Sequence, residues 1–121
     1  MPLKQKLDIT WSSVSALART LREEFSFKVQ VCATVVALLL AFYFDVSPVE
    51  WLFVIVLISI VLIVEVLNTA LEELCDYVNP DHDPRIGKIK DLGSGAAVIA
   101  SIVAIIGLAI IFIPRITVTF F

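Results

Sequence analysis

The chain has 121 residues, of which 60% are hydrophobic, and its formal net charge is -3. With a mean hydropathy of +0.99, it is far more apolar than a soluble domain, so the composition favours a single-domain integral membrane protein over residues 1–121. The acidic balance argues against nucleic acid as a partner.

An amphipathic helix on the membrane surface is predicted at about residues 8–27. Its apolar residues recur at spacings of three to five, as at Val14, Leu17 and Leu21, while most charged residues lie elsewhere. Trp11 suits the headgroup layer of a bilayer. A loose N-terminal tail is the alternative. A signal peptide is not expected, because residues 1–28 lack an apolar core that ends in a small-residue cleavage site.

The first transmembrane helix is predicted at about residues 28–44. It is short, so it must borrow a turn from the preceding helix or cross a locally thin region. The stretch DVSP that follows, residues 45–48, predicts a tight turn with Ser47 as helix N-cap and Pro48 at the first helical position. So short a connection makes the first two spans antiparallel neighbours.

Two further transmembrane helices complete an all-α membrane fold. The second is predicted at about residues 49–78, including a cytoplasmic extension, and Asn79-Pro80 ends it. A charged cytoplasmic loop at 79–90 contains two prolines, which argue against regular structure. The third span, about 91–113, is long enough to cross with some tilt before Pro114 ends it.

Basic residues predict the orientation of these helices. Of the nine Lys and Arg residues, five precede the first span, three lie at 79–90 and only Arg115 follows the last span. The positive-inside rule therefore places the N-terminus and the 79–90 loop in the cytoplasm and the C-terminus outside.

The third span is rich in Gly, Ala and Ser, which favour close helix packing. Because three helices enclose little interior, a homo-oligomer is expected. Cys32 and Cys75 are predicted to be packing residues without a disulfide or metal.

Polar residues follow one face of the second span. Glu65, Asn68, Glu72 and Asp76 are spaced by three, four and four residues, which keeps them on one side of a helix. If Pro48 marks the outer boundary, Glu65 lies about 25 Å along the axis, near the cytoplasmic edge of the hydrocarbon. A carboxylate there can hold a proton and act as a general base toward a lipid alcohol. The alternative is that these groups only join the helix to its neighbours.

Several carboxylates and a lysine at a membrane surface suggest phosphoryl transfer. Mg²⁺ prefers oxygen ligands, a cation binds the phosphates and a base accepts the hydroxyl proton. Glu24, Glu72, Lys90 and Glu65 offer these groups. The usual nucleotide motifs are absent: RIGKIKD lacks the P-loop spacing, and GSG at 93–95 does not complete a dinucleotide fingerprint.

Three short stretches then resemble one known family. They are EVLNTALE at 65–72, KDLGSGAA at 90–97 and, more weakly, EFSFK at 24–28. Together they resemble the prokaryotic diacylglycerol kinase family, which includes undecaprenol kinases, over about residues 22–114. The resemblance implies a bacterial inner-membrane kinase that uses ATP and Mg²⁺ to phosphorylate diacylglycerol or undecaprenol, and a homotrimer with active sites shared between subunits.

The resemblance also implies catalytic roles. Glu65 would take the proton from the lipid hydroxyl, and Asn68 would orient the reacting groups. Lys90 would bind the phosphates, and Asp91 would help to fix the site where the third helix begins.

Nucleotide and metal positions follow from the same resemblance. Glu24 and Glu72 would hold the Mg²⁺ of Mg-ATP, and Asp76 matches an acidic position near the nucleotide. Residues 11–18 do not clearly match the family pattern, and His82 is displaced by one residue from a histidine found in many relatives. His82 is therefore assigned no role.

Two other functional classes remain as alternatives. A small proton-coupled multidrug transporter would use Glu65 as its intramembrane carboxylate, but it would give no task to Glu24, Glu72, Lys90 or Asp91. A non-catalytic membrane adaptor would use the polar face only as a helix seam.

Overall fold

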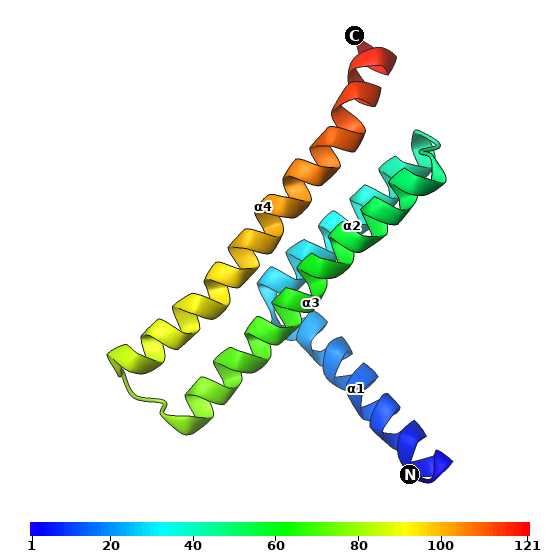
Figure 1. The fold of residues 1–121 in the computed structure, drawn as a ribbon. Helices are drawn as coiled ribbons and strands as arrows, with labels where there is room; N and C mark the ends of the chain where they lie inside the picture. The colour runs from blue at the N-terminus through cyan, green and yellow to red at the C-terminus, as the bar shows by residue number, and fades with distance from the viewer.

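The computed structural model describes all 121 residues and is entirely helical. Its four helices are α1 (Leu3–Glu23), α2 (Phe25–Tyr43), α3 (Pro48–Val78) and α4 (Pro84–Phe120). The last three are each long and apolar enough to cross a membrane. They run side by side as a bundle, from which α1 projects as an arm (Figure 1). The predicted all-α fold with three apolar spans is confirmed.

The arm differs from the predicted surface helix. α1 begins at Leu3 and ends at Glu23, because Glu24 has extended backbone angles, φ -98° and ψ 116°. Residues 25–27, which were predicted to end the surface helix, instead open α2. α1 carries its apolar residues mainly on one side, whereas α2 is apolar all round. Since a one-sided helix lies along a membrane surface and an apolar one crosses it, the chain changes direction at this point.

The turn between α2 and α3 ends in the predicted cap. The Ser47 hydroxyl accepts a hydrogen bond from the Glu50 N–H, and the Glu50 carboxylate accepts one from the Ser47 N–H, both at 3.2 Å. This reciprocal pair satisfies two backbone donors that a helix start leaves free. Pro48 occupies the first turn, where it has no backbone hydrogen bond to lose.

The loop between α3 and α4 is shorter than predicted. α4 begins at Pro84 rather than at about residue 91, so only residues 79–83 connect α3 to α4. Asp83 caps the helix by accepting the Arg85 N–H at 2.9 Å. The proline that argued against structure here starts the helix, because its fixed φ suits the first helical position. Lys90 and Asp91 therefore lie in the second and third turns of a helix.

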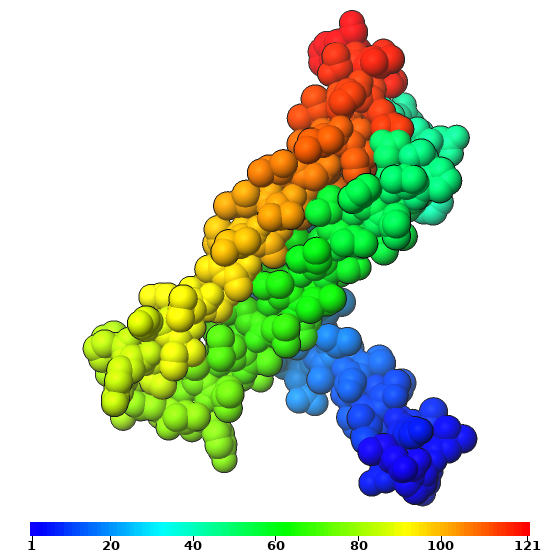
Figure 2. All heavy atoms as spheres, in the orientation of Figure 1, coloured from blue at the N-terminus to red at the C-terminus, as the bar shows by residue number.

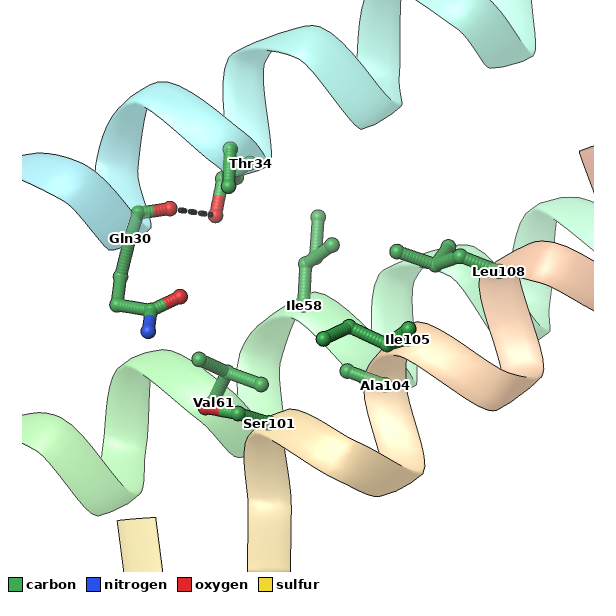
Figure 3. A pocket seen from close by; sticks show the side chains of 9 residues that line it. Gln30, Thr34, Ile58, Val61, Ser101, Ala104, Ile105 and Leu108 are labelled. Atoms are coloured by element: carbon green, nitrogen blue, oxygen red, sulfur yellow. Dashed lines mark hydrogen bonds between the residues drawn. The ribbon is translucent and has the colours of Figure 1, made fainter. Parts of the chain in front are cut away.

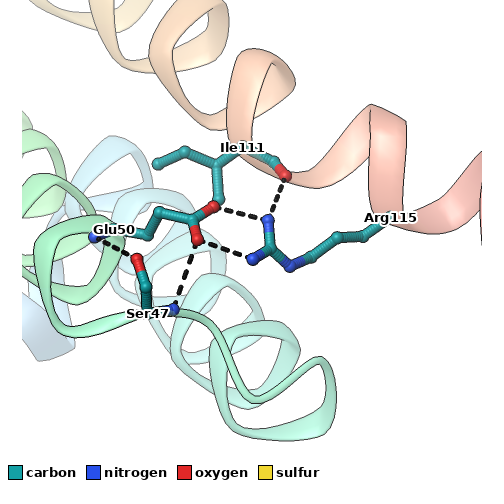
Figure 4. A network of polar contacts seen from close by, with 4 residues as sticks. All are labelled: Ser47, Glu50, Ile111 and Arg115. Atoms are coloured by element: carbon teal, nitrogen blue, oxygen red, sulfur yellow. Dashed lines mark hydrogen bonds and ion pairs between the residues drawn. The ribbon is translucent and has the colours of Figure 1, made fainter.

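α4 also runs past its predicted end, through Pro114 to Phe120. A proline inside a helix removes one backbone hydrogen bond, yet such prolines are tolerated in membrane helices. One residue on, Arg115 donates to the Ile111 carbonyl at 3.2 Å and holds the Glu50 carboxylate through both guanidinium nitrogens at 2.5 and 2.6 Å (Figure 4). This clamp ties the extended end of α4 to the start of α3.

Little of the single chain is buried. Only 13 of 121 residues are, and eight of them form two small clusters of five and three. One, at the α2–α3 turn, joins Ala41 and Val54 to Phe112 of α4. The other packs Val61 of α3 on the alanines of α4, residues 100 and 104, where small side chains let the helices approach closely. α3 and α4 make one continuous body while α1 stands apart from it (Figure 2). The outward apolar side chains suit lipid or further subunits.

Candidate active site

Glu65 is the only buried charged residue, with 8% of its surface exposed. It lies one turn beyond Val61, which packs on α4, and it takes part in none of the three ion pairs. Because an ionisable group inside an apolar span is costly, its presence favours a functional role.

Asn68 and Glu72 form the next level of the polar face. The Asn68 side-chain nitrogen donates to Glu72 Oε1 at 3.3 Å, and both residues are half-buried. The other side-chain atom, Asn68 Oδ1, is buried without a hydrogen-bond partner. An unpaired buried acceptor costs about 1–3 kcal/mol, so its presence calls for an explanation.

Asp76 and Lys90 form the outermost level. Their side chains make an ion pair that joins α3 to α4. Lys90 is 35% exposed and Asp76 61%, so this pair faces solvent. From Glu65 to Asp76 the polar face thus passes from buried through half-buried to exposed over three turns.

The loop between α3 and α4 borders this outer level. Lys90 and residues 79–83 line an open polar hollow of about 270 Å³. Arg85 lies beside Asp83 at 2.9 Å, and its guanidinium holds the pKa of the Asp83 carboxyl below its usual value, helped by the Arg85 backbone N–H. Asp83 thus stays ionised as the cap of α4.

Asp91 is not joined to the other predicted catalytic groups. It is exposed and borders a second open hollow, together with His82 and Lys88. The structure therefore brings Asn68 to Glu72 and Asp76 to Lys90, while Asp91 makes no hydrogen bond or ion pair with any of these groups.

The predicted magnesium ligands lie at two different places along the chain. Glu24 is half-buried at the junction of α1 and α2, and Glu72 is half-buried on α3. No group of three or more His, Cys, Asp or Glu side chains is arranged to hold a metal. Mg²⁺ usually takes one or two carboxylates together with phosphates and water. Glu72 fits that chemistry, since its Oε2 is free of protein partners.

A hollow of about 170 Å³ between α2, α3 and α4 was not foreseen from the sequence (Figure 3). Its walls are mostly apolar, but Gln30, Thr34 and Ser101 line it. The Thr34 hydroxyl donates to the backbone carbonyl of Gln30 at 2.8 Å. The side-chain amide of Gln30 points toward Val61 and Ser101 across the hollow (Figure 3). The isolated polar Gln30 within an apolar span was the signal available for it.

Comparisons with known proteins decide the family. The profile of the prokaryotic diacylglycerol kinases matches residues 11–112. The chain belongs to this family. An Escherichia coli diacylglycerol kinase is 35% identical over 83 residues, which cover 69% of this chain and 68% of that protein. A Bacillus subtilis undecaprenol kinase is 33% identical over 97 residues, 79% and 78% of the two chains. A Pseudomonas aeruginosa diacylglycerol kinase is 36% identical over 98 residues, 81% and 80%.

These matches confirm the family resemblance and the lipid kinase class. A prokaryotic diacylglycerol kinase family member is a membrane enzyme that uses ATP as phosphoryl donor, in agreement with the three apolar helices. The transporter interpretation is not favoured. The roles of individual residues within the site stay predictions.

Proposed function

We propose that this protein is an ATP- and Mg²⁺-dependent membrane lipid kinase that phosphorylates a lipid hydroxyl by direct in-line transfer. The main supporting observation is that the solvent exposure of the polar residues rises along α3. Glu65 is buried, Asn68 and Glu72 are half-buried, and the Asp76–Lys90 pair is exposed. A lipid alcohol resides in the apolar phase and ATP in water, so a shared site needs such a gradient at the membrane boundary.

Glu65 acts as the general base. Its carboxylate takes the hydroxyl proton as the lipid oxygen bonds to the γ-phosphorus of ATP. The bond between the γ-phosphorus and the β,γ-bridging oxygen breaks, and ADP leaves without a phosphoenzyme. Asn68, one turn along, orients the reacting groups.

Lys90 binds the nucleotide phosphates. Its ammonium now contacts the Asp76 carboxylate, so ATP must displace or share this partner, and Asp76 lies near the bound nucleotide. Asp91 follows Lys90 on α4 and helps to fix the site. Glu72 and Glu24 would hold the Mg²⁺, and the ion would neutralise charge on the phosphates.

The active form is a homotrimer with sites shared between subunits. One observation supports oligomerisation: most large apolar side chains are exposed in the single chain. An α1 arm that stands away from its own bundle is free to complete a neighbour's site. In the bacterial inner membrane, the N-terminus and the α3–α4 connection face the cytoplasm, and the C-terminus faces outward.

The acceptor is diacylglycerol or undecaprenol, since matched relatives carry both names. Labelled ATP is incubated with purified protein and each lipid in mixed micelles. Label should enter one of the two lipids, and only when Mg²⁺ is present. Absence of transfer to either alcohol would contradict the proposal.

Glu65→Gln tests the base. This variant should lose at least about a hundredfold in kcat, within the range attributed to general base catalysis, yet keep nucleotide binding and assembly. Glu50→Gln is the matched control, because it makes the same carboxylate-to-amide change at the far end of α3 and should keep kcat. Full kinase activity in Glu65→Gln would refute the assignment of the base.

A further inference from the structure

Gly93 of α4 packs against two side-chain ends of α3, which a larger residue at this position would displace. A Cβ built there would overlap Asn68 Oδ1 and lie 2.8 Å from Leu71 Cδ2. Real Cβ atoms essentially never approach another heavy atom so closely, so Asn68 Oδ1 fills the space that any other residue at 93 would need. The buried oxygen of the Asn68 amide thus packs directly against Gly93.

The neighbouring carboxylate settles which way this amide faces. A carboxylate only accepts hydrogen bonds, so the amide NH₂ of Asn68 must point toward Glu72. The carbonyl oxygen then points toward Gly93, where it is buried and unpaired. Turning the amide around would face two acceptors against each other and would lose the bond to Glu72.

We propose that Gly93 is a positioning residue, which seats the Asn68 amide against α4 and thereby sets the direction of the Glu72 carboxylate. This inference rests on the proposed function, in which Glu72 serves the metal-nucleotide. A methyl group at residue 93 has two outcomes. Either Asn68 rotates and releases Glu72, or α4 moves away from α3 and carries Lys90, three residues earlier, with it.

Two other glycines of α4 provide matched controls. Ala at Gly95 meets nothing within 4 Å, whereas Ala at Gly107 would lie 2.5 Å from Leu57 Cδ1 in the same α3–α4 interface. Gly107 is 14 residues from Gly93, about 21 Å along the axis. All three Gly→Ala changes bring the same gain in helix propensity. Only Gly93→Ala combines tight packing with contact to the polar face.

The kinetic expectation follows from this geometry. Gly93→Ala should lower kcat roughly tenfold or more and raise the Mg²⁺ concentration for half-maximal activity, since displacing a positioned group by about 1 Å costs on the order of a hundredfold. Gly107→Ala should weaken the fold but keep the Mg²⁺ dependence, and Gly95→Ala should change neither.

A second readout does not depend on activity. The chain has only two asparagines, Asn68 and Asn79, so ¹⁵N-asparagine labelling gives two side-chain NH₂ pairs in the NMR spectrum. Gly93→Ala should shift the Asn68 pair and leave the Asn79 pair, while Gly107→Ala should leave both. If the wild type had no kinase activity, the proposed function would fail while this spectrum still decided the role of Gly93.

Double variants separate Asn68 from Leu71. In an Asn68→Ala background, Gly93→Ala should cause no further loss of kcat, because the group it displaces is gone. Adding Leu71→Ala to Gly93→Ala should not restore activity. Three results would overturn the proposal: an unmoved Asn68 resonance in Gly93→Ala, the same rise in Mg²⁺ requirement in Gly107→Ala, or rescue by Leu71→Ala.

Discussion

The clamp between Glu50 and Arg115 is predicted to stabilise the fold without serving the reaction. Arg115 holds both carboxylate oxygens, at 2.5 and 2.6 Å, and the two side chains are 25% and 30% exposed. Two unit charges about 4 Å apart attract by about 1 kcal/mol in water and about 4 kcal/mol at an effective dielectric of 20. Partial exposure places the pair between these values, and side-chain ordering offsets part of the gain. We expect a coupling energy of about 1–2 kcal/mol.

A double-mutant cycle measures this coupling. Arg115→Met, Glu50→Gln and the double variant are unfolded in mixed micelles by an SDS titration, and the free energies of unfolding are compared. Glu50→Gln keeps an acceptor for the Ser47 N–H, so the helix cap is preserved while the charge is removed. Glu50 and Glu72 are about 33 Å apart along α3, so kcat per folded protein should stay at the wild-type value.

Two results would refute this reasoning. A coupling below about 0.3 kcal/mol would mean that the clamp adds nothing beyond an exposed surface pair. A large loss of kcat in Glu50→Gln at unchanged stability would mean that the Glu50 end of α3 takes part in the reaction.

Glu72→Ala should raise the Mg²⁺ concentration needed for nucleotide binding, whereas Glu73→Ala, its exposed neighbour, should not; identical Mg²⁺ titrations of the two variants would exclude Glu72 as a ligand. The Arg85 side chain, and to a smaller extent the Arg85 backbone N–H, lower the pKa of the Asp83 carboxyl. The Asp83 cap therefore stabilises α4 fully above the ordinary Asp pKa of about 3.9. This stabilisation is lost as the pH falls through the lower pKa of the folded state. Arg85→Gln should raise the Asp83 pKa, measured from the pH dependence of its carboxyl carbon in NMR; an unchanged titration would contradict the ion pair.

The helix ends show where sequence reasoning was sufficient and where it failed. The start of α3 was predicted correctly, because Ser47, Pro48 and Glu50 form a local capping pattern. The start of α4 was wrong because Pro84 was counted as a breaker, although Asp83 before it is a good cap. The end of α4 was also wrong, because Pro114 was counted as the end although the helix continues to Phe120; there Arg115 pairs with Glu50, 65 residues away in the sequence.

The candidate site divides in a similar way. The spacing of Glu65, Asn68 and Glu72 placed them on one helix face, and the structure agrees by joining Asn68 to Glu72. The contact of Lys90 with Asp76 links two helices, and no spacing rule along one helix predicts it. The contact of Asn68 with Gly93 could not be predicted for the same reason. In a helix rich in small residues, the sequence does not indicate which glycine meets which residue of the neighbouring helix.

The sequence by itself determined the membrane class, the three apolar helices and the polar face of α3, because hydropathy and helical period act within a few turns of one chain segment. Tertiary structure decided which atoms meet: Asn68 on Gly93, Lys90 on Asp76 and Arg115 on Glu50. These relations depend on the register between packed helices, which is set by the fit of side chains from distant parts of the sequence.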